Sequence, residues 1–191
     1  MTQKERTTKE TAITLSVELM GSGKASVSTG IGFFDHMLEA LAKHGLLDLD
    51  IRCQGDTHVD YHHSVEDVGI VLGQALNEEI FPANGRERFA DATVVLDEAA
   101  VSVVLDLSGR PFLVYEVPGE GLIGEFDMEL AEEFFRALVI NAGVTAHIIY
   151  QRGRNRHHIV EAAFKAFAIA LRRAVAFNER ITGVPSTKGV L

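Results

Sequence analysis

The chain has 191 residues, 47% of them apolar, and a formal net charge of −9, so it can bury one core or two small cores packed together. The negative charge disfavours binding to nucleic acid or to an anionic membrane surface, and no stretch approaches the roughly 20 apolar residues of a membrane span. A single cysteine and a polar N-terminus without the apolar segment of a secretory signal indicate a cytoplasmic globular protein.

The first half of the chain predicts strands alternating with helices. Alternation of apolar and polar residues is typical of half-buried strands, and apolar residues at helical spacing are typical of amphipathic helices. The predicted strands cover 12–20, 25–27 and 46–53, and the predicted helices cover 33–44 and 62–80. Glycines at positions 21 and 23 predict a turn between the first two strands, and Gly45 is expected to end the first helix.

The second half predicts the same order of elements. Strands are expected over 93–96, 100–107, 112–117 and 144–150, with a turn at 108–111. One helix is expected from an Asp127 cap to about Asn141, where Gly143 ends it, and another from 157 to about 177. Such an order is common among α+β proteins, and alone it does not show a duplication.

Two short blocks make an internal duplication the better interpretation. His62-His63-Ser64-Val65-Glu66 and His157-His158-Ile159-Val160-Glu161 lie about half a chain length apart, each at the start of a predicted helix. We therefore expect two half-domains, residues 1–91 and residues 92–191, the second of which includes a C-terminal phosphate-binding tail.

The blocks have the composition of metal sites. Neighbouring helical side chains diverge by about 100°, so His62 and His63 are expected to bind different ions, with another segment or subunit completing each shell. Glu66 can join either histidine, because residues three or four apart share a helix face. Imidazole and carboxylate donors without thiolate suit manganese, iron or zinc in a catalytic role. The alternative is that these histidines and glutamates are ordinary solvated residues at helix starts. That alternative could explain one such block, but it explains two blocks poorly.

Other polar residues carry weaker signals. His58 is expected to be solvated, and His147 is expected to be a satisfied strand residue. The tail segment Pro185-Ser186-Thr187-Lys188-Gly189 offers hydroxyls and an ammonium that suit a phosphate, although the glycine spacing of a P-loop is missing. Arg88 and Arg110 can add guanidinium groups, but each alone is typical of an ordinary surface arginine.

Separated motifs then run in order along almost the whole chain. They are Arg6-x-Thr8-x-Glu10-Thr11-x-Ile13, Thr29-Gly30-Ile31-Gly32-Phe33-Phe34-Asp35-His36-Met37-Leu38, Gly55-Asp56, Asp60-x-His62-His63-Ser64-Val65-Glu66-Asp67, Arg88-Phe89, Asp97-Glu98-Ala99, Asp106-Leu107-Ser108-Gly109-Arg110-Pro111, Asn155-x-His157-His158-Ile159-x-Glu161-Ala162-x-Phe164-Lys165-Ala166 and Pro185-Ser186-Thr187-Lys188-Gly189. Together these motifs resemble the imidazoleglycerol-phosphate dehydratase family of histidine biosynthesis.

The resemblance implies an α+β fold of duplicated half-domains, each a four-stranded sheet packed on two helices, similar to the second domain of ribosomal protein S5. It implies two Mn²⁺ ions per active site, with other divalent metals as alternatives. It also implies a homo-oligomer in which trimers assemble into a 24-subunit cage, with active sites between subunits.

The resemblance also implies roles for individual residues. The implied metal ligands are His36, His62, His63, Glu66, His157, His158 and Glu161. Many family members carry a histidine where this chain has Glu133, so Glu133 is a candidate oxygen ligand. The implied substrate contacts, mostly to phosphate, are His44, Arg88, Arg110, Lys165, Ser186, Thr187 and Lys188, together with Glu10, His36, His62 and His157.

The implied reaction removes water from D-erythro-imidazole-glycerol phosphate and gives imidazole-acetol phosphate. The proton that must leave is not acidic, so metal coordination of the ring as imidazolate would supply electron density, and a glutamate would move protons. Glu10 is the favoured acid/base, while Glu66 and Glu161, which are also implied ligands, remain alternatives. A metal-dependent hydrolase and a metal-storage or assembly protein are competing functions, and the phosphate-type tail counts against both.

Overall fold

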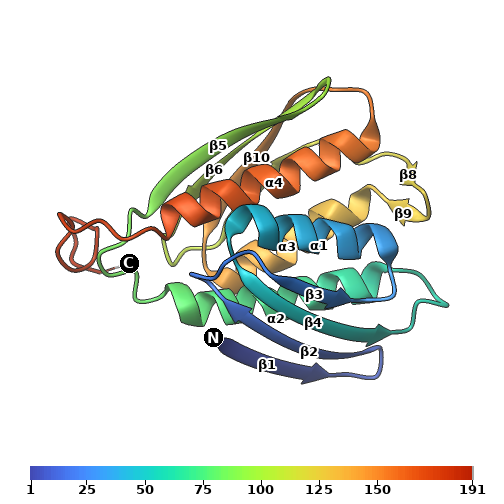
Figure 1. Ribbon diagram of the computed structural model, residues 1–191, viewed down its shortest axis with the longest axis horizontal. Helices are drawn as coiled ribbons and strands as arrows, with labels where there is room; N and C mark the ends of the chain where they lie inside the picture. Colours follow the sequence, from blue (N-terminus) through green and yellow to red (C-terminus); the bar gives the residue numbers. More distant parts are fainter. Residues whose placement is uncertain (191) are drawn as a thin grey trace.

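In residues 1–190, which the computed structural model describes, helices lie between two four-stranded sheets (Figure 1). The first sheet has the strand order β1-β2-β4-β3, in which only the β3–β4 pair is parallel. Its strands are β1 (Thr2–Thr7), β2 (Thr11–Glu18), β3 (Ala25–Ser28) and β4 (Asp48–Gly55). The helices of this half are α1 (Gly32–Gly45) and α2 (His62–Ile80).

The second half repeats this arrangement. Its sheet has the order β5-β6-β10-β7, again with one parallel pair, β10–β7. Its elements are β5 (Phe89–Leu96), β6 (Ala99–Asp106), β7 (Phe112–Glu116), α3 (Glu129–Ala142), β10 (Thr145–Arg152) and α4 (Arg156–Ala174). A small hairpin, β8 (Leu122–Ile123) and β9 (Phe126–Asp127), is inserted between β7 and α3. The predicted α+β fold with duplicated half-domains is confirmed.

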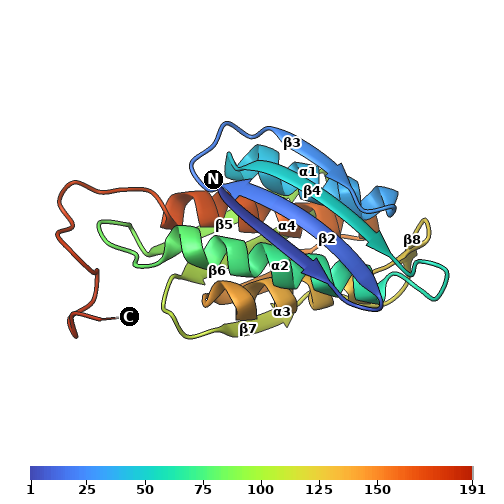
Figure 2. The ribbon, with the colours of Figure 1, turned by 90° about the horizontal axis from the view of Figure 1, so that it is seen from below.

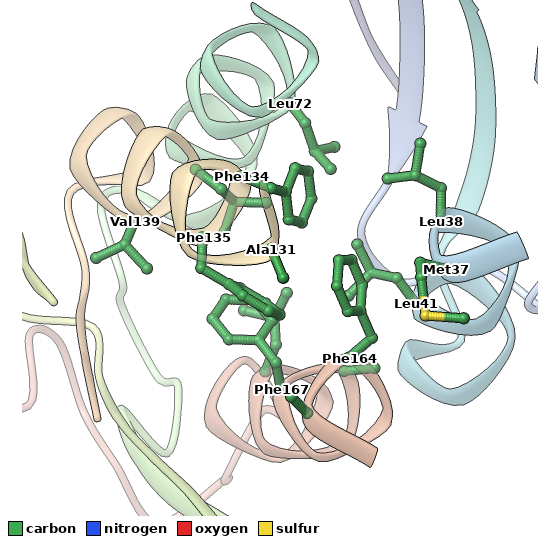
Figure 3. Packing of buried hydrophobic residues seen from close by; sticks show 14 of the residues in the cluster. Met37, Leu38, Leu41, Leu72, Ala131, Phe134, Phe135, Val139, Phe164 and Phe167 are labelled. Carbon is green, nitrogen blue, oxygen red and sulfur yellow. The ribbon is translucent and has the colours of Figure 1, made fainter. Parts of the chain in front are cut away.

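The helices form the layer between the sheets, with α2 against α3 and α1 against α4 (Figures 1 and 2). Gly69 and Gly73 let α2 approach α3 closely, because a Cβ at either position would lie under 3.0 Å from a backbone oxygen of α3. Aromatic side chains of α3 and α4 meet at the centre of the layer (Figure 3). There Phe135 and Phe164 have ring centroids 4.6 Å apart, within the range of favourable aromatic pairs.

Most predicted elements are found within a few residues of their predicted bounds, and the 62–80 helix matches α2. The sequence prediction lacks β1, which is polar on both faces and lies at a sheet edge, and the two-residue strands β8 and β9. β5 begins at Phe89, before the predicted division between residues 91 and 92. The predicted second half extends to residue 191, which lies outside the described residues. Among the described residues, no helix is both long enough and apolar enough to cross a membrane.

The predicted end of the first helix at Gly45 is confirmed, and the predicted end of the last helix is wrong. Gly45 is the last residue of α1, and the left-handed C-cap is Leu46, with φ 55°. A Cβ at Gly45 would lie 3.1 Å from Leu47 Cγ, so this residue packs closely against the Leu47 side chain. The last helix ends at Ala174 rather than near residue 177. Its terminal carbonyl groups accept hydrogen bonds from the segment 86–88, including Arg88 N to Ala174 O at 2.9 Å, which redirects the chain.

Gly73→Ala should destabilise the protein, because the added Cβ would lie 2.6 Å from Leu138 O and 2.7 Å from Asn141 Cβ. Overpacking costs about 1–3 kcal/mol, and the better helix propensity of alanine offsets about 1 kcal/mol of this. We expect a net loss of stability in chemical denaturation followed by circular dichroism. Gly32→Ala is the control, since a Cβ there would meet no atom within 4 Å. Equal stability of the two variants would contradict the close α2–α3 packing.

Candidate metal and substrate site

Both histidine blocks occupy the first turns of their helices, α2 and α4, at the same end of the molecule (Figure 1). The rings of His62 and His63 have centroids 6.2 Å apart and an interplanar angle of 87°. The rings of His157 and His158 repeat this geometry at 6.2 Å and 84°. The two rings of a block therefore face different partners, and the duplication extends to side-chain geometry.

The second block forms a three-ligand cluster with a residue of the first half. His157 Nε2 lies 3.0 Å from Glu161 Oε2, and His36 Nε2, from α1, lies 3.7 Å from the same oxygen. The potential ligand atoms of these three residues all lie within 4.8 Å of one another. Nitrogen and carboxylate donors without thiolate fit manganese, iron or zinc. The packing of α1 on α4 thus creates a suitable metal site across the two halves.

Glu161 is buried, yet its environment keeps it ionised. Burial raises its pKa, but Lys165, His36 and His157 together outweigh burial, so the net pKa lies below the ordinary value. Lys165 Nζ lies 2.6 Å from Glu161 Oε1, one turn along α4. Further along the same pair of helices, burial and the neighbouring Lys165 lower the pKa of His44. The ionised carboxylate of the cluster therefore lies beside the ammonium of Lys165.

The first block faces a different set of carboxylates. His62 Nε2 lies 3.7 Å from Glu66 Oε2, a looser pair than His157 and Glu161. His63 Nδ1 lies 3.0 Å from Asp56 Oδ2, and its Nε2 lies 3.7 Å from Glu10 Oε1. The hydrogen bond to Asp56 raises the pKa of His63. Glu10 thus reaches the first block from the β1–β2 turn.

A carboxylate that sequence reasoning had not assigned holds the second histidine of the second block. Glu98 Oε2 lies 2.9 Å from His158 Nδ1. Backbone N–H groups, first that of Asn155, together with His158 lower the pKa of Glu98 to about 2. Asp56 was equally unassigned. Both residues belong to motifs that carry the family resemblance. Glu98 lies directly before β6, as Glu10 lies directly before β2, and this equivalent position in the sequence could have identified Glu98 as a candidate site residue.

Glu133 stands apart from these contacts. It is half-buried on α3, where it occupies the position that His36 occupies on α1. Among the described residues its side chain makes no hydrogen bond or ion pair, and the three-ligand cluster does not include it. His58 is exposed in the loop before α2, and His147 is exposed on β10.

A cavity of ≈ 360 Å³ adjoins His62, between the loop before α2 and the β8–β9 hairpin. Its polar lining includes the carboxylates of Asp60, Glu125, Asp127 and Glu129. Tyr61 spans the cavity wall with a 3.1 Å hydrogen bond to Glu125. This negative lining would repel a phosphate, so an anionic group must be held elsewhere.

Among the candidate phosphate contacts, Lys165 and His44 lie near Glu161, whereas the two arginines and the tail residues gather at the other end of α4. Arg88 binds Asp106 Oδ1 through Nε at 2.7 Å and donates from Nη1 to Pro185 O at 2.8 Å, which ties the C-terminal tail to the second sheet. Arg110 is largely exposed beside the same aspartate. Ser186 Oγ accepts a hydrogen bond from Lys188 N at 3.2 Å, and Thr187 is exposed.

One chain does not bring the two candidate groups together. Helix α4 has 19 residues, so it is about 28 Å long at a rise of about 1.5 Å per residue. The histidine cluster lies at its N-terminal end, and Arg88 and the tail lie at its C-terminal end (Figures 1 and 2). A small phosphorylated molecule cannot span that distance.

Comparisons with known proteins identify the family of this chain. Residues 29–171 match the family model described as imidazoleglycerol-phosphate dehydratase. The protein of that name from Nautilia profundicola is 61% identical over all of both chains. That from Campylobacter concisus is 65% identical over 97% of this chain and 95% of its own.

Solved structures with that name are also similar to this chain. The Pyrococcus furiosus structure, described as in complex with (S)-C348, has a TM-score of 0.85 and 39% identity and covers 98% of this chain and 100% of its own. The Staphylococcus aureus structure has a TM-score of 0.83 and 42% identity over 92% and 98% of the two chains. With family motifs, duplicated fold and paired histidine blocks all present, the chain belongs to the imidazoleglycerol-phosphate dehydratase family.

Proposed function

We propose that this chain removes water from D-erythro-imidazole-glycerol phosphate in a metal-dependent reaction of histidine biosynthesis, giving imidazole-acetol phosphate. The observation that carries the metal dependence is the cluster of His36, His157 and Glu161, whose ligand atoms lie within 4.8 Å of one another. A hydro-lyase of this family would have a site for an imidazole ring and a site for a phosphate. The chain carries residues suited to both.

Two Mn²⁺ ions per active site are the proposed cofactors, with other divalent metals as alternatives. The second-half cluster would hold one ion, and the first block would supply His62 and Glu66 to the other, with Glu133 as a further candidate. His63 and His158 would add a ring nitrogen to shells completed by another subunit. When bound, such ions act as Lewis acids that polarise a coordinated ring and favour loss of the neighbouring hydroxyl.

Glu10 is the proposed acid/base. It is exposed at the β1–β2 turn, and its carboxylate lies 3.7 Å from His63 Nε2, with no closer ion-pair partner within residues 1–190. The reaction removes a proton from the carbon that becomes the carbonyl and expels hydroxide, as water, from the carbon attached to the ring. The resulting enol then takes up a proton at the carbon attached to the ring and loses its O–H proton to become the ketone. An exposed carboxylate suits these transfers better than that of Glu161, which is paired with Lys165.

The active site is proposed to lie between subunits of a homo-oligomer, in which trimers assemble into a 24-subunit cage. Its support is the separation, along α4, of the histidine cluster from Arg88 and the C-terminal tail. The outer face of the second sheet adds further support, because Phe89, Val104 and Phe112 are each more than half exposed there, and such apolar faces mark protein interaction sites. A cytoplasmic location belongs to the same proposal, supported by the single free cysteine, Cys53.

Incubation of the purified protein with imidazole-glycerol phosphate tests the function directly. We expect imidazole-acetol phosphate to form with Mn²⁺ and not after removal of metal by a chelator, because the proton to be removed is not acidic without metal assistance. Product formation is measured by mass spectrometry. Turnover that persists in the fully metal-free protein would refute the metal dependence, and release of inorganic phosphate instead would indicate a hydrolase.

Removal of metal should also break the assembly into smaller oligomers. Ligands contributed by two subunits to one ion hold those subunits together, and the contact is lost with the ion. Light scattering before and after chelation measures the change, and re-addition of Mn²⁺ is the control for reversibility. An unchanged molecular mass after complete metal removal would argue against metal sites between subunits.

Glu10→Gln should lower kcat by about 10²–10⁴-fold while Mn²⁺ content stays unchanged, because an amide keeps the size of the side chain but cannot exchange a proton. Glu66→Gln is the matched variant, and it should lower Mn²⁺ occupancy because an amide is the poorer ligand. Measuring kcat beside metal content separates the two roles. A nearly normal kcat in the Glu10 variant would remove Glu10 from the mechanism.

A further inference from the structure

The carboxylate of Glu98 receives hydrogen bonds from the segment that begins α4. Its Oε1 accepts from the backbone N–H groups of Arg154 at 2.9 Å and Asn155 at 2.7 Å, and its Oε2 lies 2.9 Å from His158 Nδ1. Glu98 belongs to the tight turn between β5 and β6, where Asp97 has φ 48°. The second sheet therefore determines where this carboxylate lies.

These contacts determine which nitrogen of His158 carries a proton. A carboxylate can only accept hydrogen bonds, so Nδ1 must donate, and a neutral ring then keeps its lone pair on Nε2. Histidines that bind metals commonly donate their other ring N–H to a carboxylate, which fixes both the tautomer and the direction of the ring. The geometry at His158 has this form.

The first half holds its second histidine with a different residue. Asp56, in the loop between β4 and α2, binds His63 Nδ1 at 3.0 Å. Glu10 has the same place before β2 that Glu98 has before β6, yet it faces His63 Nε2 at 3.7 Å. The two equivalent glutamates thus face different ring nitrogens, since Glu10 faces Nε2 of its histidine and Glu98 faces Nδ1. One copy stays exposed for chemistry, and the other is engaged in hydrogen bonds.

We propose that Glu98 is a positioning residue that presents Nε2 of His158 to one of the two metal ions, as the second-half equivalent of Asp56. The inference rests on the proposed metal-dependent function and deepens it. Because Glu98 also holds the backbone of Arg154 and Asn155, one side chain sets both the start of α4 and the direction of the ring. Asn155, whose Oδ1 accepts from His158 N at 3.3 Å, adds to the same anchor.

Glu98→Gln tests this role because glutamine has one acceptor oxygen where glutamate has two. With that oxygen kept on the two backbone N–H groups, the amide nitrogen faces His158 Nδ1 and donates to it. The ring proton then moves to Nε2 and blocks that nitrogen. We expect one of the two Mn²⁺ ions per chain to bind about 10–100-fold more weakly and the other to bind normally, as measured by the electron paramagnetic resonance signal of free Mn²⁺.

A second readout does not depend on metal. In the metal-free protein, ¹⁵N NMR of the histidine rings should show His158 protonated on Nε2 in Glu98→Gln and on Nδ1 in the wild type. Thermal stability of the metal-free protein should be unchanged in Glu98→Gln and reduced in Glu98→Ala, which also loses the backbone anchor. Glu116→Gln, at the exposed end of β7, removes the same charge and should leave Mn²⁺ affinity unchanged.

Two results would overturn the inference. One is unchanged affinity for both ions in Glu98→Gln. The other is that Glu98→Gln weakens the binding of both ions equally and lowers thermal stability as much as Glu98→Ala does. Glu98 would then be only an anchor of the fold. Wild-type dehydratase activity is measured on the same preparation. An inactive wild type that binds two Mn²⁺ contradicts the proposed function alone, and an active wild type beside an unaffected variant contradicts this inference alone.

Discussion

The packing of helices between two sheets is the constraint on which every candidate site residue depends. Each half contributes one helix to each contact, because α2 packs on α3 and α1 packs on α4. This exchange of partners places His36, from the first half, beside Glu161 of the second. Gly69 and Gly73 allow α2 and α3 to pack closely, because neither residue has a side chain between the two helices. The aromatic cluster in Figure 3 fills its centre, so the metal-type cluster rests on a rigid core.

Helix α4 separates two kinds of chemistry. Its N-terminal end carries histidines and an ionised, buried glutamate, and its C-terminal end adjoins Arg88 and the tail. Lys165 lies between these two ends, and its Nζ forms an ion pair with Glu161 Oε1 at 2.6 Å. Since a helix of this length keeps its ends apart, a substrate that needs both groups needs two chains. This separation of functional groups along the helix is the basis of the proposed assembly.

Duplication produced equivalent positions, and the side chains at those positions then diverged. His36 on α1 has Glu133 as its counterpart on α3, and Glu10 has Glu98. The second histidine of each block has a carboxylate on Nδ1, but Asp56 supplies it in one half and Glu98 in the other. The two proposed ions would therefore have unequal surroundings despite the repeated fold. In the proposed mechanism, such unequal surroundings would allow one ion and one glutamate to serve chemistry while their counterparts serve structure.

The sequence by itself determined the order of the helices and most strands, the duplication and the place of both histidine blocks. These features depend on local periodicity, which is why the 62–80 helix was predicted to the residue. Only the tertiary structure decided the position of β1, a polar edge strand without an apolar pattern, and the partners of His63 and His158. Glu98 and His158 are 60 positions apart, and their contact depends on where the second sheet places the turn before β6 relative to the start of α4. Contacts of that kind follow from the packing of whole elements, and no local pattern encodes them.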